Sequence, residues 1–513
     1  MYIAIPIPNR CVVSGFACAV LMFALPDLAV ADIKLPAIIS DHMVLKKGSK
    51  IPIWGKAEPG EAVKVTLGDV SAKATADSTG KWIASLDLSE SKAGPFTLNV
   101  AGKNQIAVND VLVGEVWLAS GQSNMAFLLE KQTGSAEDIA KSANPALRQF
   151  QVTRVEPPEP SDEGGGKWTV ASPETSGKFS AVGYYFQKQL NKELGVPVGI
   201  ISTGVGGSAC EAWISPQSIE ADPHLKAARE ASLQARLTAT KAVFRSRTEP
   251  SCLFNGMIHP ILSYPINGVI WYQGETNVSR AWQYRSAFPM LIKDWRTQWK
   301  QPDLPFYFCQ LANFKPKTAA PEESPDAELR ESQSLALKLP HTGQAVLIDI
   351  GEAGDIHPRN KKDVGDRLAR IALADCHGKK IAFSGPVYQS MKIEGDKIRL
   401  TFTHTDGGLT AKPLPATYDV KTEKGVTAPL VRNSPNSELA GFAICGADHK
   451  WVWADAKIDG DSVVVWSDQV PKPVAVRYAW ASNPTCNLYN GAGLPASPFR
   501  TDDEPATTRD AVF

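Results

Sequence analysis

Hydrophobic and polar positions follow two different rhythms along the chain. Short β-rich runs separated by turn residues fill residues 32–107, and a similar pattern returns from about residue 382 onward. Closely and regularly spaced strands of this kind are typical of all-β sandwiches. The pattern therefore predicts an N-terminal β-sandwich domain at 32–107 and a C-terminal β-rich domain at 382–513.

Between these regions, at 108–381, short apolar runs alternate with amphipathic stretches. Apolar side chains recur in steps of three and four at 181–194 and again at 284–299, which predicts one helix in each stretch. An Ala-rich segment indicates a helical insertion at about 208–265. Alternating strands and helices predict an α/β domain, a parallel sheet with helices on both faces. The apolar runs are "VLVGEVWLA", "VPVGIIST", "INGVIWY", "LPFYFCQLA" and "QAVLIDI".

The first 31 residues have the pattern of a signal peptide. Arg10 precedes the apolar run "CVVSGFACAVLMFAL", and small residues at Ala29–Ala31 precede Asp32. A membrane anchor is the alternative, but the run is shorter than the ~20 residues that a span needs. We therefore expect a secreted or periplasmic protein that makes no membrane contact once the signal is removed.

Charge and cysteine content limit the partners. The 513 residues include 54 basic and 54 acidic side chains with no basic tract, which argues against nucleic acid as a partner. The six cysteines after residue 31 show neither a CxxC pair nor the Cys/His spacing of a metal site, so no metal is predicted. Cys210 and Cys252 could form a disulfide across the insertion, or all six could be free thiols. The oligomeric state is left open.

Polar residues follow each of the five apolar runs. In a parallel sheet the carboxyl ends of the strands meet at one edge and gather the ligand site there. The residues concerned are Ser123, then Gly204–Gly207, then Gln273, Glu275 and Asn277, then Asn313, and finally Asp355 and His357. This convergence predicts an active site.

The residue types suit acyl transfer. A serine hydroxyl needs a neighbouring base to become a nucleophile, and His357 could take the Ser123 proton while Asp355 orients the imidazole. The backbone N–H groups of Ser123 and Gly207, with the Gln273 side-chain amide, could stabilise a developing oxyanion.

Three longer motifs resemble the sialate O-acetylesterase family, within the SGNH-type carbohydrate esterases. They are "GQSNM", "GVIWYQGETN" and "DIHPRNK", and the likeness extends to "LFNGMIHP" and to the closing "RYAWASNPTCNLYNGAGLPASPFRTD". The resemblance implies an SGNH/flavodoxin-like sheet that hydrolyses O-acetyl esters on sugars without metal or organic cofactor. It assigns Ser123 as nucleophile, His357 as base, and Ser123 N–H, Gly207 N–H and Gln273 as oxyanion donors.

The sequence departs from that family pattern at the acidic residue. Many SGNH enzymes place it three positions before the histidine, where this chain has Gly354, whereas Asp355 is only two positions before. A Ser–His dyad assisted by a backbone carbonyl is one alternative. Glu352 or Asp349 could also supply the carboxylate.

Further side chains are candidates for sugar binding. Glu275 could contact substrate, but a structural acid that fixes the Ser123 turn is the favoured interpretation. Trp213 could stack on a sugar ring, although buried tryptophans are more often core residues. Asn277 and Asn255 complete the candidate substrate-binding set, although Asn255 could instead only satisfy local backbone groups. A sialic acid carboxylate would need a cation, for which Arg280, Arg285 and Arg359 are available.

Other functions remain open at this point. An acetylesterase for xylan or another polysaccharide would use the same mechanism on an acetylated glycan. A glycoside hydrolase would pair Glu115 with Glu275. A non-catalytic carbohydrate-binding protein would fit the two β-rich regions and the 13 tryptophans, but it would leave the Ser123 and His357 turns without a role.

Overall fold

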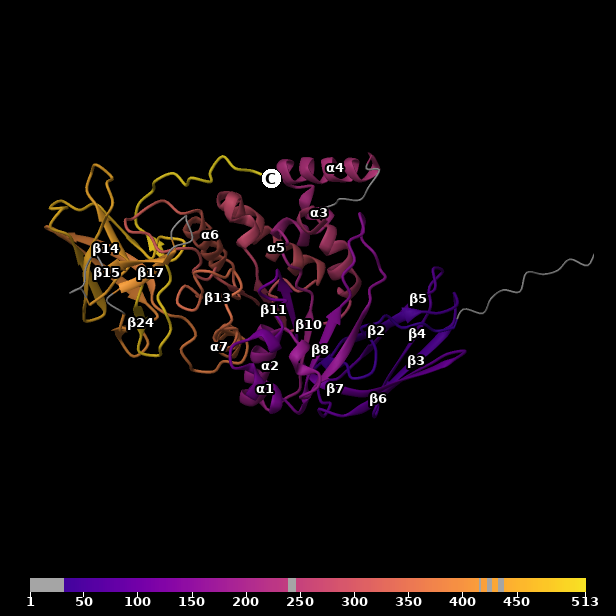
Figure 1. Ribbon diagram of the computed structural model, residues 1–513. Coiled ribbons are helices and arrows are strands. Elements are labelled where there is room, and N and C mark those ends of the chain that lie inside the picture. The colour runs from indigo at the N-terminus through magenta and orange to yellow at the C-terminus, as the bar shows by residue number, and fades with distance from the viewer. Residues whose placement is uncertain (1–31, 239–245, 415–416, 422–426, 432–437) are drawn as a thin grey trace, which may run out of the picture.

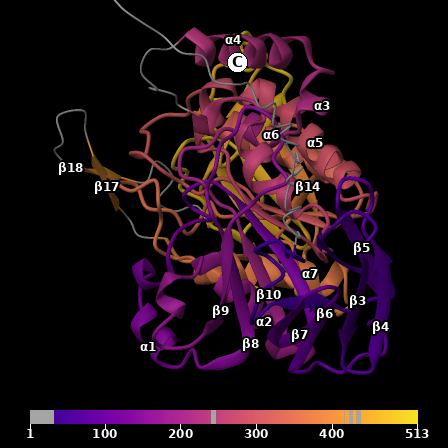
Figure 2. The same cartoon turned by 90° about the vertical axis from the view of Figure 1, so that its right-hand side faces the viewer.

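The computed structural model describes residues 32–238, 246–414, 417–421, 427–431 and 438–513. The predicted signal peptide, residues 1–31, lies outside the described residues. A mixed sheet with helices occupies the centre of the molecule, and antiparallel β structure lies at either end (Figures 1 and 2). The centre carries the strand ends on which the candidate site depends.

The central sheet has the strand order β13-β12-β11-β7-β10-β8-β9. All neighbours along it are parallel except β8 and β9, which are antiparallel. The strands are β7 (Gln105–Gly121), β8 (Asn144–Val152), β9 (Gly166–Ala171), β10 (Val198–Ser202), β11 (Gly268–Tyr272), β12 (Phe306–Cys309) and β13 (Thr342–Ala345).

Helices cover both faces of this sheet. The α-helices are α1 (Ser135–Ala140), α2 (Ala181–Leu194), α3 (Pro216–Ile219), α4 (Pro223–Thr238), α5 (Ala281–Gln298), α6 (Pro325–Ser334) and α7 (Lys362–Asp375). Shorter helical turns are η1 (Leu129–Lys131), η2 (Ser176–Lys178), η3 (Cys210–Trp213), η4 (Ser246–Thr248), η5 (Phe254–Ile258), η6 (His259–Ile261), η7 (Glu275–Arg280) and η8 (Leu335–Lys338). The two helices predicted from apolar spacing correspond to α2 and α5, and the Ala-rich insertion contains α4.

Alternate side chains of β7 face opposite layers, as the period of a strand requires. Trp117 and Ala119 belong to the core that includes α2 and α7, whereas Val116 and Leu118 belong to the core that includes α5. Because both faces are covered, the strand is apolar throughout this stretch.

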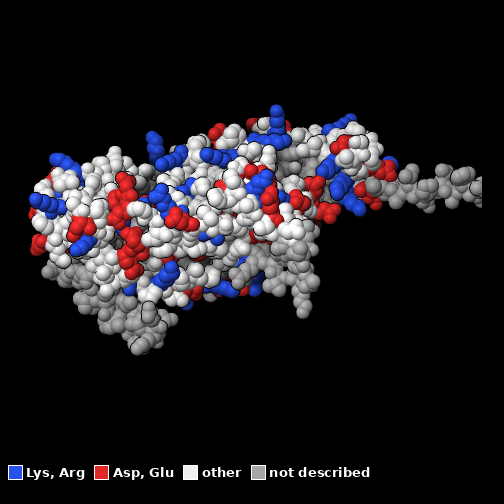
Figure 3. Space-filling view, turned by 90° about the horizontal axis from the view of Figure 1, so that it is seen from above, with Lys and Arg blue, Asp and Glu red and all other residues white. Residues whose placement is uncertain are grey.

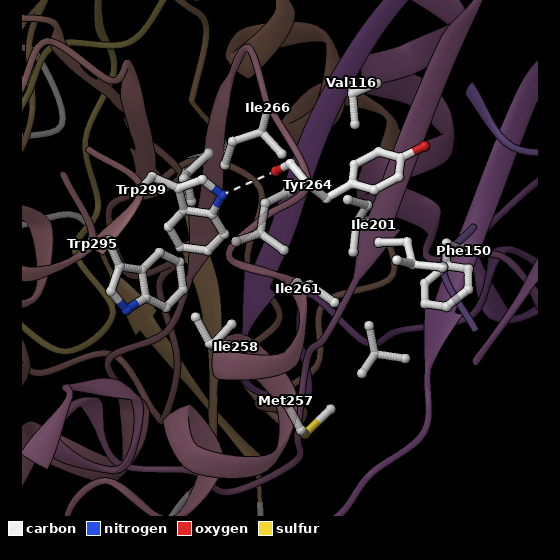
Figure 4. Close-up of a cluster of buried hydrophobic side chains, with 14 of the residues drawn as sticks. Val116, Phe150, Ile201, Met257, Ile258, Ile261, Tyr264, Ile266, Trp295 and Trp299 are labelled. Atoms are coloured by element: carbon white, nitrogen blue, oxygen red, sulfur yellow. Dashed lines mark hydrogen bonds between the residues drawn. The ribbon is translucent and has the colours of Figure 1, made fainter. Parts of the chain in front are cut away.

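The α5 core is rich in aromatic side chains (Figure 4). Trp295 of α5 and Trp299, which directly follows the helix, belong to this core. The Trp299 indole N–H donates to the Tyr264 carbonyl oxygen at 3.2 Å. This hydrogen bond satisfies a buried polar group and ties α5 to the segment that leads into β11.

The N-terminal β region is built on the first half of β7. The strand pairs there with β1 and β6, and β6 pairs with β3, so the sheet continues from one region into the next. The predicted boundary at 107 falls inside β7, and the domain limits stay a prediction. The other strands are β1 (Val44–Lys46), β2 (Ile51–Lys56), β3 (Ala62–Leu67), β4 (Val70–Thr75), β5 (Lys81–Leu86) and β6 (Phe96–Ala101).

The described residues of the C-terminal β region form two four-stranded antiparallel sheets and two strand pairs. Their orders are β14-β15-β22-β21, β20-β19-β23-β25, β16-β24 and β17-β18. The strands are β14 (Val387–Glu394), β15 (Lys397–Thr403), β16 (Leu409–Ala411), β17 (Thr417–Lys421), β18 (Thr427–Val431), β19 (Phe442–Cys445), β20 (Val452–Trp453), β21 (Asp455–Asp459), β22 (Ser462–Trp466), β23 (Ala475–Tyr478), β24 (Leu488–Asn490) and β25 (Phe499–Arg500).

The topology predicts where a ligand binds. Strands β10-β7-β11-β12-β13 run in the chain order 2-1-3-4-5 of a flavodoxin-like sheet, and the order reverses at β7. Ligands of such sheets bind beyond the carboxyl ends of the strands at that switch point, which here is the turn after β7. The predicted fold class, a parallel α/β sheet flanked by β-rich regions, is confirmed.

The surface shows no broad single-sign region on the face drawn in Figure 3. Basic and acidic side chains are interspersed among the described residues of that face. Within the described ranges, no helix combines the length and the apolar character needed to cross a bilayer.

Candidate active site

The chain brings Ser123 and His357 into hydrogen-bonding contact. The Ser123 Oγ and His357 Nε2 atoms are 2.9 Å apart, and both residues are half-buried. Ser123 follows the end of β7 and His357 lies in the segment between β13 and α7. The geometry is that of a serine and the base that takes its proton.

The turn that carries Ser123 requires a glycine at its start. Gly121 has φ +132°, and a Cβ atom there would lie 2.2 Å from the Tyr272 carbonyl oxygen. The next residue, Gln122, donates its backbone N–H to that same oxygen at 2.9 Å and accepts from Gly274 N–H through its side chain at 3.2 Å. These bonds fix the Ser123 turn against the end of β11.

Asp355 lies beside the His357 imidazole, but the shortest hydrogen bond of its carboxylate goes to the His357 backbone and not to the ring. Its Oδ1 atom accepts the His357 backbone N–H at 2.8 Å and lies 3.5 Å from His357 Nδ1, with half of the side chain exposed. The two other carboxylates considered from sequence are engaged elsewhere: Glu352 pairs with Arg359, and Asp349 pairs with Arg367. Asp355 is therefore the acid next to the ring, in a weak geometry.

Two backbone N–H groups are free at the predicted oxyanion position. In the described part of the chain, neither Ser123 N–H nor Gly207 N–H donates to another protein group. The two residues are brought together by Gly206, which directly precedes Gly207 and lies beside Ser123. A Cβ atom on Gly206 would lie 3.6 Å from Ser123 Cβ. Gly207 has φ +69°, a conformation that favours glycine.

The structure does not support Gln273 as a third oxyanion donor. Both of its amide hydrogens are donated inside the protein, one to the Ser208 carbonyl oxygen at 3.1 Å and one to Asn277 Oδ1 at 2.7 Å. Its own oxygen accepts from the Tyr284 hydroxyl at 2.8 Å, and the side chain is fully buried. Gln273 stabilises the turn after β10 through its hydrogen bond to Ser208 and has no amide hydrogen left for a ligand.

Three predicted sugar-binding residues lie in the core. Trp213 is fully buried against Trp271 and donates to Ser208 Oγ at 3.0 Å. Asn277 is buried and donates to both carboxylate oxygens of Glu211 at 3.0 Å. Asn255 is also buried, with its amide bound to the carbonyl oxygens of Pro157 and Pro158. Trp213 and Asn255 thus take the structural roles that were their alternatives, a core aromatic and a side chain that satisfies backbone groups. The substrate-binding prediction for Asn277 is wrong, because sequence patterns report polarity but not depth.

Glu275 contacts the Ser123 turn, in agreement with its favoured interpretation as a structural acid. Its Oε1 atom accepts from the Asn124 amide at 2.6 Å, and its Oε2 atom is buried with no hydrogen-bond partner. Burial raises the pKa of this carboxyl. The arginines considered for a substrate carboxylate are also engaged: Arg280 with Glu211, Arg285 with Glu331, and Arg359 with Glu352.

Sequence reasoning missed the network behind the Ser–His pair. The Asn124 amide donates to Glu275 and, at 3.0 Å, to the carbonyl oxygen of Ile356, while its oxygen accepts from Lys361 Nζ at 2.6 Å. Asn124 lies in the motif "GQSNM", next to Ser123, and Lys361 lies in the motif "DIHPRNK", four positions after His357. The sequence does not show that the side chains of Asn124 and Lys361 are buried, and this burial is what identifies the network.

Arg247 was also missed. Its exposed guanidinium covers the turn after β10, with Cζ 3.2 Å from where a Gly207 Cβ would lie and Nη1 3.5 Å from the Gly206 carbonyl oxygen. It thereby places a positive charge next to Gly207.

The carboxylate pair of a glycoside hydrolase is not formed. Glu115 lies in β7 six residues before the strand ends, which is roughly 20 Å along a strand, whereas Glu275 follows β11 at the Ser123 end. Paired glycosidase carboxylates are about 5–9.5 Å apart. Glu115 instead accepts the Trp117 indole N–H at 3.1 Å.

Neither a metal cluster nor the considered disulfide is found in the described ranges. Nowhere in them do three or more His, Cys, Asp or Glu side chains come together as ligands for a metal ion. Cys210 carries a free, buried thiol, so it does not pair with Cys252.

Comparison with known proteins identifies the family of the chain. Residues 113–374 match the family model described as carbohydrate esterase, sialic acid-specific acetylesterase. Sialate O-acetylesterase of Homo sapiens is 28% identical, covering 94% of this chain and 96% of its own, and that of Mus musculus is 29% identical, covering 91% and 94%.

A solved structure extends the similarity to three dimensions. The crystal structure of XAC1771, a carbohydrate acetylesterase from Xanthomonas citri, is 40% identical and has a TM-score of 0.79, covering 92% of this chain and 99% of its own. This protein is therefore a carbohydrate esterase, a carboxylic ester hydrolase that belongs to the sialic acid-specific acetylesterase family.

Proposed function

We propose that this protein hydrolyses O-acetyl esters on carbohydrates through an acyl-enzyme formed on Ser123, with His357 as the general base. The observation that carries the proposal is the 2.9 Å contact between Ser123 Oγ and His357 Nε2 at the topological switch point of the sheet. Two free backbone N–H groups beside that contact support the same chemistry.

The first half-reaction forms the acyl-enzyme. His357 Nε2 takes the Ser123 proton as Oγ attacks the acetyl carbonyl carbon, and the carbonyl oxygen becomes an oxyanion. Ser123 N–H and Gly207 N–H donate to that oxygen; one such donor is typically worth about 3 kcal/mol in the transition state. The imidazolium then gives its proton to the sugar oxygen, which leaves as an alcohol.

The second half-reaction uses the same groups in reverse. His357 takes a proton from water as the water oxygen attacks the acyl carbonyl carbon. The imidazolium then returns that proton to Ser123 Oγ as the bond between Oγ and the carbonyl carbon breaks, which releases acetic acid. Asp355 stabilises the positive imidazole in both steps, only modestly because it lies 3.5 Å from Nδ1 and is half exposed.

The substrate proposed is an O-acetylated sialic acid, as the family description suggests. Acetylated xylan and other acetylated polysaccharides are the alternative substrates for the same machinery. The experiment is to measure acetate release from O-acetyl sialic acid, acetylated xylan and acetylated neutral oligosaccharides. Release from the neutral substrates alone would replace the sialate proposal while leaving the esterase proposal intact.

A matched pair of variants tests the nucleophile. Ser123→Ala removes the Oγ atom and should abolish acetate release and labelling by a serine-reactive phosphonate. Ser120→Ala is the control, since Ser120 lies three residues earlier with a buried hydroxyl that has no hydrogen-bond partner. Full activity in Ser123→Ala would refute the mechanism, and an unlabelled but active wild type would do so as well.

We further propose that the protein is exported. Arg10, the apolar run after it and Ala29–Ala31 form the signal pattern on which this proposal depends. N-terminal sequencing of the protein recovered from the periplasm or medium of its host should begin at Asp32. Recovery from the cytoplasm with an intact N-terminus would contradict it.

A further inference from the structure

We propose that Lys361 is a positioning residue of this active site, acting on Ser123 and His357 through the side-chain amide of Asn124. The inference rests on the proposed function of Ser123 and His357. It assigns a role to a buried cation that the acyl-transfer steps do not themselves use.

The amide of Asn124 has one orientation that satisfies all its neighbours. Lysine can only donate, so Lys361 Nζ at 2.6 Å must face the Asn124 oxygen. A carboxylate and a carbonyl can only accept, so Glu275 at 2.6 Å and Ile356 at 3.0 Å must face the amide nitrogen. Lys361 therefore fixes which way the amide points.

The Asn124 amide in turn joins the two reacting loops. Asn124 directly follows Ser123, and Ile356 directly precedes His357. The hydrogen bond from Asn124 to the Ile356 carbonyl is thus a tie between the backbones on either side of the Ser123–His357 contact. If the amide turned over, its oxygen would face the Ile356 oxygen and this tie would become repulsive.

Lys361 itself is held firmly. Its side chain is fully buried, with Nζ 4.8 Å from the Phe127 ring centre and 5.3 Å from that of Tyr272, distances typical of cation–π contacts. Its backbone N–H donates to Gln132 Oε1 at 2.5 Å, and its carbonyl accepts from Gly365 N–H in the first turn of α7.

The charged and titratable groups around Lys361 come from four segments, the first of which is β11, whose last residue Tyr272 has its ring beside the ammonium. Glu275 lies on η7, Cys309 ends β12, and Asp355 and Glu352 lie, with His357, in the segment that leads to Lys361. Burial lowers the pKa of the Lys361 ammonium to about 8, so it is mainly charged at neutral pH and loses its charge in the mildly alkaline range.

The test compares Lys361→Met with Lys362→Met, which removes the exposed neighbouring lysine instead. Assays run below the melting temperature of each variant report kcat and KM separately. A displacement of about 1 Å at a reacting pair costs roughly 10²-fold in rate. We expect kcat of Lys361→Met to fall by about that factor with KM nearly unchanged, and Lys362→Met to match wild type.

A second variant covers the case in which Lys361→Met does not fold. In Lys361→Arg the guanidinium stays charged at all accessible pH values, and it still donates to Asn124 Oδ1. The wild-type kcat should decline above about pH 8. In Lys361→Arg this decline should move to higher pH.

Two outcomes would overturn the inference. One is a kcat of Lys361→Met within threefold of Lys362→Met, and the other is an alkaline decline at the same pH in wild type and Lys361→Arg. Ser123→Ala separates this result from the proposed function. If Ser123→Ala is inactive and Lys361→Met is fully active, only the proposal about Lys361 is refuted. If Ser123→Ala is active, the proposed function itself is refuted.

Discussion

The Asp355 carboxylate lies 3.5 Å from His357 Nδ1, while its short hydrogen bond, at 2.8 Å, goes to the His357 backbone N–H. The acid therefore holds the loop as much as it orients the ring. A carboxylate two positions before the histidine, rather than three, explains the geometry, because it is close enough to cap the backbone of its own turn.

This relationship predicts a modest effect of Asp355→Asn. The asparagine oxygen can still accept the His357 N–H, so the turn survives, and only the charge next to the imidazolium is lost. We expect kcat/KM to fall about tenfold, or ~1.4 kcal/mol in transition-state free energy. Steady-state kinetics on acetate release measure it, with Glu352→Gln as the control. A loss of about 10⁴-fold would instead assign Asp355 the full role of a triad acid.

The glycine turn after β10 allows a matched comparison. Gly207 and Gly195 both have φ +69°, but Gly195 ends α2 with open space around it. Gly207 instead lies under Arg247 and directly follows Gly206, the glycine that lies beside Ser123. Alanine at either position costs about 1 kcal/mol in stability. Only Gly207→Ala should also lower kcat, by roughly 10²-fold, because it displaces an oxyanion donor. Equal kcat values in the two variants would exclude Gly207 from the oxyanion site.

Gln273 offers a test of the corrected assignment. In Gln273→Leu the Ser208 carbonyl and the Tyr284 hydroxyl lose the Gln273 amide, whereas Asn277 Oδ1 keeps the Cys210 N–H. Each buried group left unsatisfied costs about 1–3 kcal/mol. We expect a large fall in Tm with kcat per labelled Ser123 close to wild type. If kcat per labelled site instead dropped about 10²-fold, Gln273 would be a direct oxyanion donor after all.

The sequence was sufficient for the positions of the reacting groups and insufficient for their surroundings. Ser123 and His357 were predictable because polar residues following apolar runs must meet at one sheet edge. Trp213 lies in the core, as is usual for a tryptophan. Asn277 was misjudged because a polar residue near a glycine turn looks the same whether it faces a ligand or the core. Lys361 was overlooked because a lysine at a helix start is usually solvated, and only the packing of Phe127 and Tyr272 around it shows otherwise.

Because the Lys361 ammonium is buried, we expect the free energy of unfolding to rise with pH in the same range in which kcat falls. Its pKa is about 8 in the folded protein and 10.5 when exposed, so between these values the unfolded chain binds more protons and stability rises with pH. The shift corresponds to about 3 kcal/mol. The measurement is the free energy of unfolding in urea of wild type and of Lys361→Met at pH 7.5, 9 and 10. The value for wild type minus that for Lys361→Met should rise over this range while the kcat of wild type declines. A constant difference between the two proteins over this range would mean that the ammonium is not desolvated, which would remove the physical basis for a precisely aimed Asn124 amide.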